Sequence, residues 1–398
     1  MAEAVIVSTA RSPIGRARKG SLVSLRPDDL AAQVISAALG DIPASEITDL
    51  HLGCAEPQDE HGQNIARRVA VQLGHDNLPG TTVNRFCASS VQTARMAFHA
   101  IKAGEGHGFI SAGVECVSRY MHSGVPSFNP LFDEAQQRTQ ATAASNVAWT
   151  DPRLEGKLPD YYIAMGQTAE NVATQMGISR HDQDEFGVRS QNLAEKAIAD
   201  GFFAREITPV VLPDGTVVST DDGPRAGVTY EAVSSLKPSF RPEGTITAGN
   251  CCPLNDGAAA VVIMSSTRAK ELGLTPLARI VSTGVSGLSP EIMGLGPVDA
   301  TKQALSHAGL SISDIDLVEI NEAFAVQVLG SQRALGIDID KLNVHGGAIA
   351  LGHPFGSTGA RIMTTLINGM QARDAQFGLE TMCVGGGQGM AIILERLS

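Results

Sequence analysis

The sequence predicts an α/β protein made of two similar halves, with a long insertion in the first half. Short strand-like segments alternate with segments of helical periodicity at both ends of the chain, as in sheets whose faces are covered by helices. In each half a strand runs into a polar or thiol corner and then a helix, Val83 into Cys87 and Ile320 into Asn321. Residues 118–249 lack this rhythm, so we expect a duplicated fold with an inserted loop domain.

Local apolar patterns define the elements of the first half. The clearest is the helix after Cys87, because apolar residues recur at helical spacing from Val91 to Gly104. The other expected elements are, in chain order, a strand at 4–9, a helix at 28–39, a strand at 49–53, a helix at 62–73 and a strand at 107–113. We expect 1–268 to form the first domain, with 118–249 covering its site.

The insertion is expected to contain helices, a hairpin and an irregular segment, whereas the second half should return to alternating strands and helices. Residues 120–159 are polar and rich in proline, which indicates an excursion outside the sheet, and Ser179 is a suitable N-cap for the helix after it. The insertion should also hold helices at 165–176 and 181–200 and a hairpin at 210–220. The second half, with domain limits 269–398, follows a strand at 257–265 and should contain strands at 278–283, 317–320 and 381–394 and helices at 298–308, after Asn321 and at 359–370.

Composition excludes several classes of function. The formal net charge of −12 argues against a general nucleic-acid or membrane surface, and no apolar run approaches the length of a membrane span. The N-terminus lacks the features of a signal peptide, and Arg396-Leu397-Ser398 is not a peroxisomal ending. The six cysteines contain no CxxC pair, so we expect reduced thiols and a cytoplasmic location.

Cys87 is the first candidate for chemistry. It should lie at the first turn of a helix, where unpaired N–H groups and the helix dipole favour an anion. Such placement lowers the pKa of a thiol and makes it nucleophilic at neutral pH. The alternative is that Cys87 is only a small buried apolar residue.

Two further corners carry residues suited to act with Cys87. The run from Gly346 to Gly359 is dense in glycine, predicts a loop and holds His353, which could accept the proton of Cys87. Cys383 ends a strand before Gly385, Gly386 and Gly387, whose N–H groups could stabilise an oxyanion. Taken alone, each corner is also compatible with a purely structural role.

Together these motifs resemble the thiolase family over essentially the whole chain. The resemblance rests on Cys87, on Asn321-Glu322-Ala323-Phe324, on Gly352-His353-Pro354 and on Cys383 before the triple glycine, in the order of the family. It implies two α/β halves stacked as a five-layered αβαβα fold, a loop domain over the site, and a homo-oligomer, dimer or tetramer. It also implies coenzyme A thioesters as substrates, with no separate cofactor and no metal, and a place in fatty-acid β-oxidation.

The resemblance also implies a role for each matching residue. Cys87 corresponds to the nucleophile that carries the acyl group, His353 to its base, and Cys383 to the acid and base at the thioester α-carbon. Asn321 corresponds to the residue that holds a water which, with His353, forms one oxyanion site. The backbone N–H groups of Cys87 and Gly385 correspond to the other.

The resemblance places coenzyme A against a second set of residues. These are Arg225, Phe240, Ala248, Cys252, Met165, Ala323 and Phe324. Arg225 could meet adenine or phosphate, or could be a solvated surface residue. The chain departs from the family at Cys252, where a serine is usual, at Ala232, which lacks a hydroxyl, and at Ala164, which replaces a histidine; these changes favour a substrate longer than acetoacetyl-CoA.

Three other interpretations remain at this stage. One is a condensing enzyme of the ketoacyl-synthase type, which the Cys383 motif disfavours. Another is a non-catalytic acyl-CoA or lipid carrier on the same scaffold, which Cys87, His353 and Cys383 disfavour. The third is a metal or redox site at Cys251 and Cys252, which lacks neighbouring ligands for a zinc set.

Overall fold

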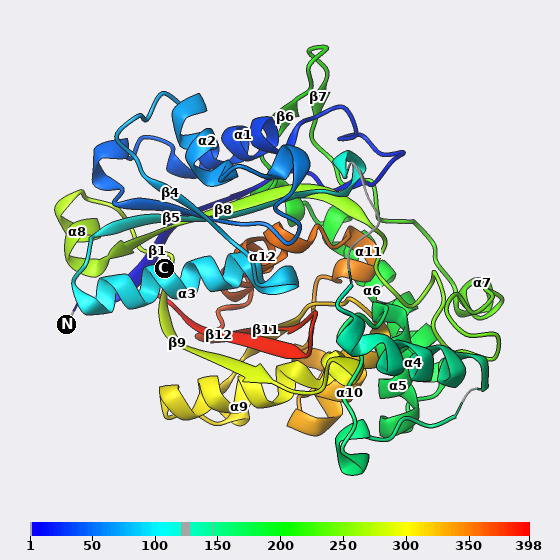
Figure 1. The fold of residues 1–398 in the computed structure, drawn as a ribbon. Helices are drawn as coiled ribbons and strands as arrows, with labels where there is room; N and C mark the ends of the chain where they lie inside the picture. Colours follow the sequence, from blue (N-terminus) through cyan, green and yellow to red (C-terminus); the bar gives the residue numbers. More distant parts are fainter. Residues whose placement is uncertain (1, 121–127, 146) are drawn as a thin grey trace.

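The computed structural model describes residues 2–120, 128–145 and 147–398, and it confirms a layered α/β fold (Figure 1). The first half contains β1 (Ala4–Arg11), β2 (Gly15–Arg16), α1 (Pro27–Leu39), β3 (Asp49–Gly53), α2 (Ile65–Gln72), β4 (Gly80–Val83), α3 (Ser89–Ala103), β5 (Gly108–Cys116), β8 (Asn255–Ser265) and α8 (Ser266–Glu271). The second half contains β9 (Ala278–Gly287), α9 (Gly296–Ala308), β10 (Leu317–Ile320), α10 (Ala325–Leu335), α11 (Ala348–Leu351), α12 (Thr358–Arg373), β11 (Phe377–Val384) and β12 (Gln388–Arg396).

Within the described residues, the strands of both halves form one ten-stranded sheet in two parts. The first part has the order β4-β3-β5-β8-β1, and the second has the order β9-β12-β11-β10. The parts join only where Val5 and Ile6 of β1 pair with β9. Figure 1 shows α1 and α2 on one outer face, α3 and α12 between the two parts, and α9 and α10 on the other outer face. This is the five-layered αβαβα arrangement that the family resemblance implied.

Each sheet part buries apolar side chains on both faces, which explains why its strands read as nearly continuous apolar runs. One core cluster lies under α1 and α2, a second lies between the two parts around α3 and α12, and a third lies under α9 and α10. β5 and β8 are buried over their whole length. The central helices therefore have fixed positions, and their N-terminal ends position the candidate site.

The two halves repeat the same topology, but the correspondence predicted from the sequence is wrong by one strand. In the first half β3 lies parallel to both β5 and β4. In the second half β10 lies parallel to β11 and makes a parallel bridge from Val318 to Leu342 on its other side. Leu342 therefore occupies the place that β4 has in the first half. The counterpart of the Cys87 corner is then the His353 segment before α12. Asn321 instead corresponds to Cys54, because it follows β10 as Cys54 follows β3.

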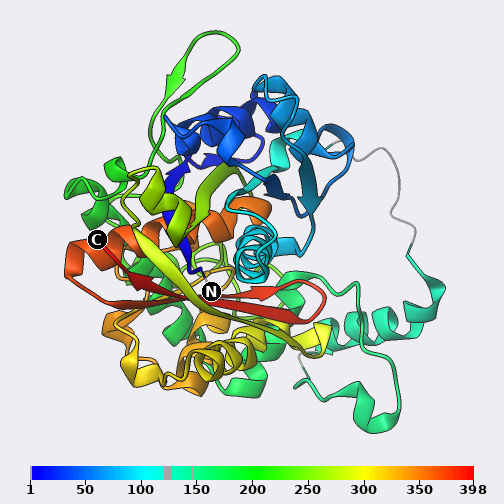
Figure 2. The same ribbon diagram turned by 90° about the vertical axis from the view of Figure 1, so that its left-hand side faces the viewer.

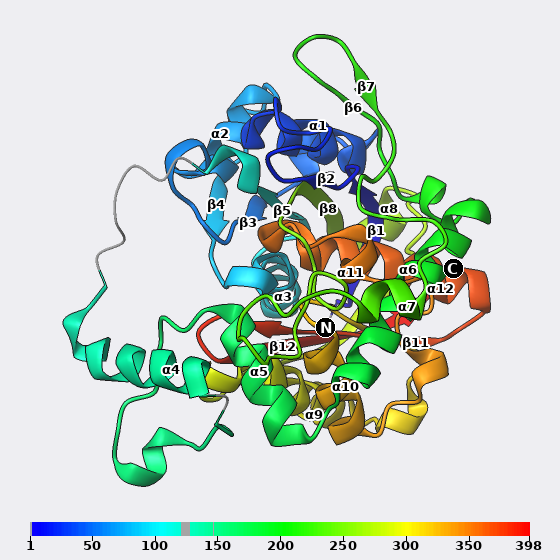
Figure 3. The same ribbon diagram turned by 90° about the vertical axis from the view of Figure 1, so that its right-hand side faces the viewer.

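The insertion contains α4 (Asp133–Ser145), α5 (Met165–Met176), α6 (Arg180–Ala199), β6 (Val210–Val211), β7 (Val217–Val218) and α7 (Tyr230–Ser234). The hairpin and the helices α5 and α6 were predicted, and Ser179 caps α6 by accepting a hydrogen bond from the N–H of Asp182 at 3.1 Å. The helix α4 was not predicted, because its sequence has no apolar face. Figure 2 shows α4 outside the layered body, and Figure 3 shows α5 and α6 beside α10.

Other differences concern element ends. β5 continues through Gly113 to Cys116, and α2 begins three residues later than expected, at Ile65. The glycine-rich run predicted as a loop contains α11 and a 3-10 turn at Phe355–Ser357. The turn of α11 forms because its residues are good helix formers and because the N–H of Ile349 donates to the Glu322 carboxylate at 3.1 Å.

Glycine allows the two halves to meet closely behind the candidate site. A Cβ on Gly113 of β5 would lie 2.1 Å from the carbonyl oxygen of Gly356. We expect Gly113→Ala to lower the free energy of unfolding by about 1–3 kcal/mol or more, because backbone atoms must move. Gly287→Ala is the control, because no atom lies within 4 Å of the added Cβ. Thermal unfolding of both variants checks this, and equal stability losses would contradict it.

Candidate active site

Cys87 lies on a strained turn between β4 and α3. The turn is the 3-10 segment Phe86–Ala88, and Phe86 has a φ of +44°, which is rare for a residue with a side chain. The side chain of Ser89 stabilises the turn, since its hydroxyl accepts from the N–H of Arg85 at 2.9 Å and donates to the Phe86 carbonyl at 2.6 Å. The predicted sequence of strand, sharp turn and helix at Cys87 is therefore confirmed.

The surroundings of the Cys87 sulfur correct the prediction of a lowered pKa. Burial raises the pKa of the thiol to about 11, although the backbone N–H groups of Gly385 and of Cys87 itself donate to the sulfur and favour the thiolate. The negative charge of Glu115 raises the pKa further. The thiol is therefore protonated at neutral pH, and a base must remove its proton during the reaction.

Alkylation provides a test of this protonation state. Because only the thiolate is nucleophilic, the rate of Cys87 carboxamidomethylation by iodoacetamide should rise about tenfold per pH unit between about pH 7 and pH 10. Mass spectrometry of the Cys87 peptide measures this rate separately from the other cysteines. A rate that is already independent of pH near neutrality would show that the thiol is activated at rest.

His353 is held as a neutral imidazole. Its Nδ1 lies 2.7 Å from the Thr358 hydroxyl, which donates its own hydrogen to the Pro354 carbonyl at 3.0 Å, so Nδ1–H is the donor. Its Nε2 accepts from the Asn321 side-chain amide at 3.2 Å. Burial, and then the positive charge of Arg361, lower the pKa of His353 to about 3. At neutral pH His353 is therefore an uncharged imidazole, and its one Nε2 lone pair faces the Asn321 amide.

Asn255 fixes the backbone that carries His353. Its side-chain oxygen accepts from the N–H of His353 at 3.0 Å, and its amide donates to the Gly15 carbonyl at 3.0 Å. Gly352 has a φ of +115°, and a Cβ there would lie 2.5 Å from Asn255. Sequence reasoning did not identify Asn255 or Thr358, because neither stands out from the polar residues around it.

Two buried carboxylates connect the segments that meet at the site. Glu115, at the end of β5, accepts from the N–H groups of Ala55 and Gly356 at 2.7 and 2.8 Å. Burial raises the pKa of Glu115. Glu322 accepts from Ser190, Asn343 and Ile349. The sequence signal for Glu322 was its place beside Asn321, and Glu115 could have been noted as a charge within an apolar strand.

The two predicted catalytic sulfurs lie near each other. Cys383 is fully buried near the end of β11, and burial raises its pKa well above the ordinary value, with a further rise from the charge of Cys87. The pKa of Cys252 is raised mainly by burial, then by its neighbour Cys251, and then by Cys87 and Cys383. The described residues therefore bring Cys87, Cys252 and Cys383 together, each as a neutral thiol at neutral pH.

A cavity of about 390 Å³ opens onto Cys87. It is lined by Ala55, Glu56, Phe86, Cys87, Tyr161, Tyr162, Ile163, Met165, Phe355, Gly385 and Gly386. The ring centroids of His353 and Phe355 are 5.0 Å apart. Because Phe355 lines the cavity, the imidazole lies next to it. Cys87 and Gly385 thus line one region, and His353 with its partner Asn321 lies next to it. Sequence reasoning missed residues 161–163, because they lie between the excursion expected at 120–159 and the helix expected at 165–176 and belong to no predicted element.

Comparison with known proteins agrees with this geometry. The model of the thiolase N-terminal domain matches residues 4–267, and that of the thiolase C-terminal domain matches residues 274–396. The chain belongs to the thiolase family. This assignment supports the main interpretation over a ketoacyl-synthase-type enzyme and over a non-catalytic carrier.

Individual relatives of this thiolase cover its full length. The 3-ketoacyl-CoA thiolase of Bacillus subtilis is 43% identical, over 99% of this chain and 100% of that protein. The acetyl-CoA acetyltransferase of Cupriavidus necator is 42% identical over 100% of both chains. The crystal structure of the Bacillus anthracis acetyl-CoA acetyltransferase superposes with a TM-score of 0.87, at 38% identity, over 100% of this chain and 99% of that chain.

Five of the seven residues expected to contact coenzyme A form a group that begins at Met165 on the lining of the thiolase cavity. Met165 lines the cavity at the start of α5, and the Phe240 ring packs on Gly166 next to it. The rings of Phe240 and Phe324 are 6.3 Å apart. The N–H of Cys252 donates to the Ala323 carbonyl at 3.0 Å. These contacts place Met165, Phe240, Cys252, Ala323 and Phe324 together, and their contact with coenzyme A stays a prediction.

The other two residues, Ala248 and Arg225, are exposed and do not line the cavity at Cys87. Ala248 is exposed on the turn before Asn250, whose carbonyl accepts from the N–H of Ala325 at 2.8 Å. Arg225 is exposed on the loop before α7, and among the described residues its side chain makes no hydrogen bond or ion pair.

Across residues 2–120, 128–145 and 147–398, no group of three or more histidine, cysteine or acidic side chains is placed to hold a metal ion. In the same part of the chain, no helix has both the length and the apolar character needed to cross a membrane. All six cysteines are free thiols.

Proposed function

We propose that this thiolase cleaves 3-ketoacyl-CoA with coenzyme A, giving acetyl-CoA and a shortened acyl-CoA through an acyl-Cys87 intermediate. The reverse reaction joins two acetyl-CoA molecules into acetoacetyl-CoA. One observation carries the proposal, namely that the Cys87 sulfur lies under two backbone N–H groups in a cavity beside a neutral His353. The names of the relatives from Bacillus subtilis and Cupriavidus necator describe these two directions.

In the first half-reaction His353 Nε2 takes the proton of the Cys87 thiol, and the sulfur attacks the keto carbon. The N–H groups of Cys87 and Gly385 are suited to stabilise one oxyanion, and His353 with a water held by Asn321 is suited to stabilise the other. The bond between C2 and C3 then breaks, which leaves the acyl group on Cys87 and an acetyl-CoA enolate. The protonated thiol of Cys383 transfers its proton to the enolate carbon, and acetyl-CoA leaves.

In the second half-reaction free coenzyme A resolves the intermediate. The Cys383 thiolate takes the proton of the coenzyme A thiol, and the resulting thiolate attacks the carbonyl of acyl-Cys87. The Cys87 sulfur leaves and receives the proton held by His353. Both cysteines and the imidazole return to their neutral forms, so no external acid or base is consumed.

The cavity lining supports an apolar acyl chain. Phe86, Ile163 and Phe355 contribute apolar surface, and Glu56 is the only charged lining residue described. A relative from Acinetobacter baylyi, 41% identical, is named beta-ketoadipyl-CoA thiolase, and the acyl chain in that name ends in a carboxylate. The negative charge of Glu56 disfavours such a substrate here. We therefore infer a 3-ketoacyl chain longer than acetoacetyl and without a terminal charge.

Acyl transfer to Cys87 and substrate choice can be tested in one set of experiments. Incubation with 3-ketoacyl-CoA and acid quenching should leave an acyl group on the Cys87 peptide, detected by mass spectrometry. Thiolysis rates from acetoacetyl-CoA to 3-ketodecanoyl-CoA, with β-ketoadipyl-CoA alongside, should be highest for a neutral chain longer than acetoacetyl. An acyl group on another residue would refute the intermediate, and a preference for β-ketoadipyl-CoA would refute only the proposed substrate.

We also propose a homo-oligomer in the cytoplasm. β4, immediately before Cys87, is at the end of the sheet order, so one of its edges is unpaired within the described chain. Unpaired edges favour association with another strand, and a second copy supplies one. The free thiols agree with a reducing compartment. Light scattering at several concentrations should report a dimer or tetramer, and a monomer would contradict the proposal.

A further inference from the structure

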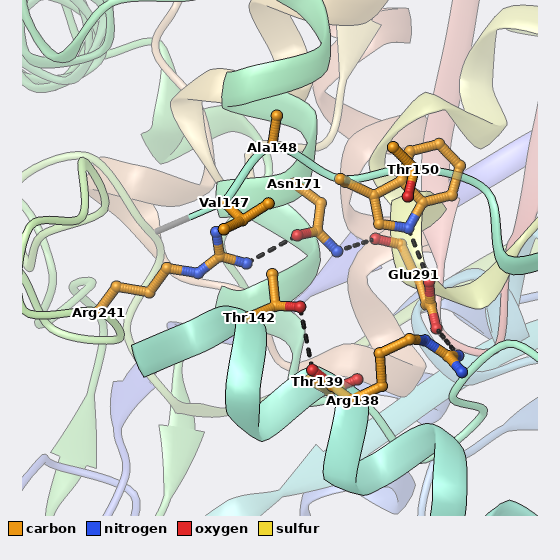
Figure 4. Close-up of a pocket in the computed structure, with 10 residues that line it drawn as sticks. Arg138, Thr139, Thr142, Val147, Ala148, Thr150, Asn171, Arg241 and Glu291 are labelled. Atoms are coloured by element: carbon orange, nitrogen blue, oxygen red, sulfur yellow. Dashed lines mark hydrogen bonds and ion pairs between the residues drawn. The ribbon is translucent and has the colours of Figure 1, made fainter. Parts of the chain in front are cut away.

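A second cavity lies between α4, α5 and the 3-10 segment Pro290–Leu295, and it shares no lining residue with the cavity at Cys87. Its volume is about 190 Å³, room for about six water molecules at about 30 Å³ each. Its lining is formed by Arg138, Thr139, Thr142, Val147, Ala148, Trp149, Thr150, Asn171, Arg241 and Glu291 (Figure 4). The proposed reaction uses none of these residues.

Arg241 is the group that points to a ligand. The side chain is 3% exposed, and Figure 4 shows its guanidinium directed toward Val147 and Asn171. Nε donates to Gln167 at 2.8 Å and Nη2 donates to the Asn171 side-chain oxygen at 2.7 Å. Nη1 is buried and has no hydrogen-bond partner. An unsatisfied buried donor on a charged group is costly, so an acceptor is expected at this position.

The described lining residues do not supply that acceptor. One Glu291 carboxylate oxygen already accepts from Arg138 at 3.0 Å and from the N–H of Asp160 at 2.8 Å, and the other accepts from Trp149 at 2.7 Å. The Asn171 oxygen is occupied by Arg241. Arg241 Nη1 therefore has no acceptor among the described residues, and a ligand that brings acceptor atoms would satisfy it.

Charge and shape narrow the chemical class. The charged side chains of the lining are Arg138, Arg241 and Glu291. Arg138 pairs with Glu291 at 3.0 Å, which leaves Arg241 as the cation that faces the cavity, with the carboxylate of Glu170 also near it. A planar carboxylate suits the fork geometry of a guanidinium. Val147, Ala148 and the Trp149 ring leave apolar surface for a short carbon chain. We propose that this cavity binds a small monocarboxylate through Arg241, as a site separate from the reaction centre.

The location connects such a site to the reaction cavity. The N–H of Asp160 donates to Glu291, and the Asp160 carboxylate accepts from the N–H of Tyr162 at 3.0 Å. Tyr161, Tyr162 and Ile163 then line the cavity at Cys87. The two cavities therefore lie on opposite sides of one short segment, 160–163. Because the second cavity contains none of the reacting residues, ligand binding to it can be measured without turnover.

Trp149 reports on this site directly, because it is the only tryptophan of the chain. Titration with sodium acetate at constant ionic strength, balanced with sodium chloride, should give a saturable change in its fluorescence. Arg241→Gln should raise the apparent Kd for acetate about tenfold or more, because the charged hydrogen bond is lost. Arg153→Gln, which removes an exposed arginine of the same insertion, should change Kd less than about twofold.

A second variant keeps the test decisive if Arg241→Gln fails to fold, which circular dichroism would show. Ala148→Leu retains Arg241 and fills the cavity from an exposed position, so it should also weaken acetate binding. A fluorescence change that does not saturate, or an unchanged Kd in folded Arg241→Gln or Ala148→Leu, would overturn the site. A saturable response to inorganic phosphate or chloride but not to acetate would overturn the assignment to carboxylates.

Discussion

Cys87→Ala is expected to reduce thiolysis by about 10⁵-fold or more, because the variant has no atom that can hold the acyl group. The neighbouring sulfurs cannot take over this role. Cys383 is fully buried, and burial raises the pKa of both Cys252 and Cys383 well above the ordinary value. Only Cys87 combines contact with the cavity and donation from the Gly385 N–H. Single-turnover thiolysis with excess enzyme measures the loss without interference from product release.

Cys252→Ala is the matched control, since it removes a thiol from the same cluster but not the proposed nucleophile. It should retain thiolysis within about tenfold and keep the acyl group on the Cys87 peptide. Substrate binding to Cys87→Ala should also persist, because the residues expected to contact coenzyme A are unchanged. Turnover or acyl labelling of Cys87→Ala at the level of the unchanged protein would exclude the nucleophilic role.

The sequence predicted most of the layered body, because its strands are buried and apolar. Residues 49–53 and 317–320 were predicted with the observed limits, since each is a short segment with regularly placed apolar residues that ends at a glycine or polar corner. The segment around Leu342 could not be predicted, because it contributes a single bridge to the sheet. That one missing strand is why the sequence rhythm paired the Cys87 corner with the Asn321 corner.

The candidate site was predicted to a different depth. Cys87, His353, Asn321 and Cys383 could be identified because each is a reactive or polar group at the end of an apolar strand or in a glycine-rich run. The protonation state of Cys87 could not be predicted. Its position at a helix start predicts a low pKa, whereas burial raises the pKa to about 11. Burial depends on contacts between segments far apart in the chain, and no local pattern records them.

The supporting groups were the hardest to predict, because their roles depend on tertiary contacts. Thr358 is an ordinary residue at the start of a helix until the fold places its hydroxyl 2.7 Å from His353 Nδ1. Arg241 likewise has no sequence signal, and only its burial and unpartnered Nη1 set it apart from other arginines. Residues that position a reactive group, or that point to a ligand, therefore required the structure.

Cys383→Ala should separate the two kinds of chemistry assigned to this site. Thiolysis requires a proton for the enolate carbon, so its rate should fall about 10²–10⁴-fold when the acid is removed. Exchange of the acetyl group between acetyl-CoA and labelled coenzyme A breaks no carbon–carbon bond. In the proposed second half-reaction Cys383 also carries the proton of the coenzyme A thiol. Without Cys383, His353 can pass the proton of Cys87 directly to the departing coenzyme A sulfur, so exchange should fall less than thiolysis, by about tenfold.

Cys383→Ser distinguishes loss of the acid from loss of packing. Serine nearly preserves the volume of the buried side chain but is a much weaker acid, so thiolysis should stay low while stability stays close to that of the unchanged protein. If Cys383 only filled the core, Cys383→Ser would restore thiolysis. If it also activated Cys87, exchange and thiolysis would fall together in both variants. A selective loss of thiolysis is therefore the result that assigns the proton at the α-carbon to Cys383.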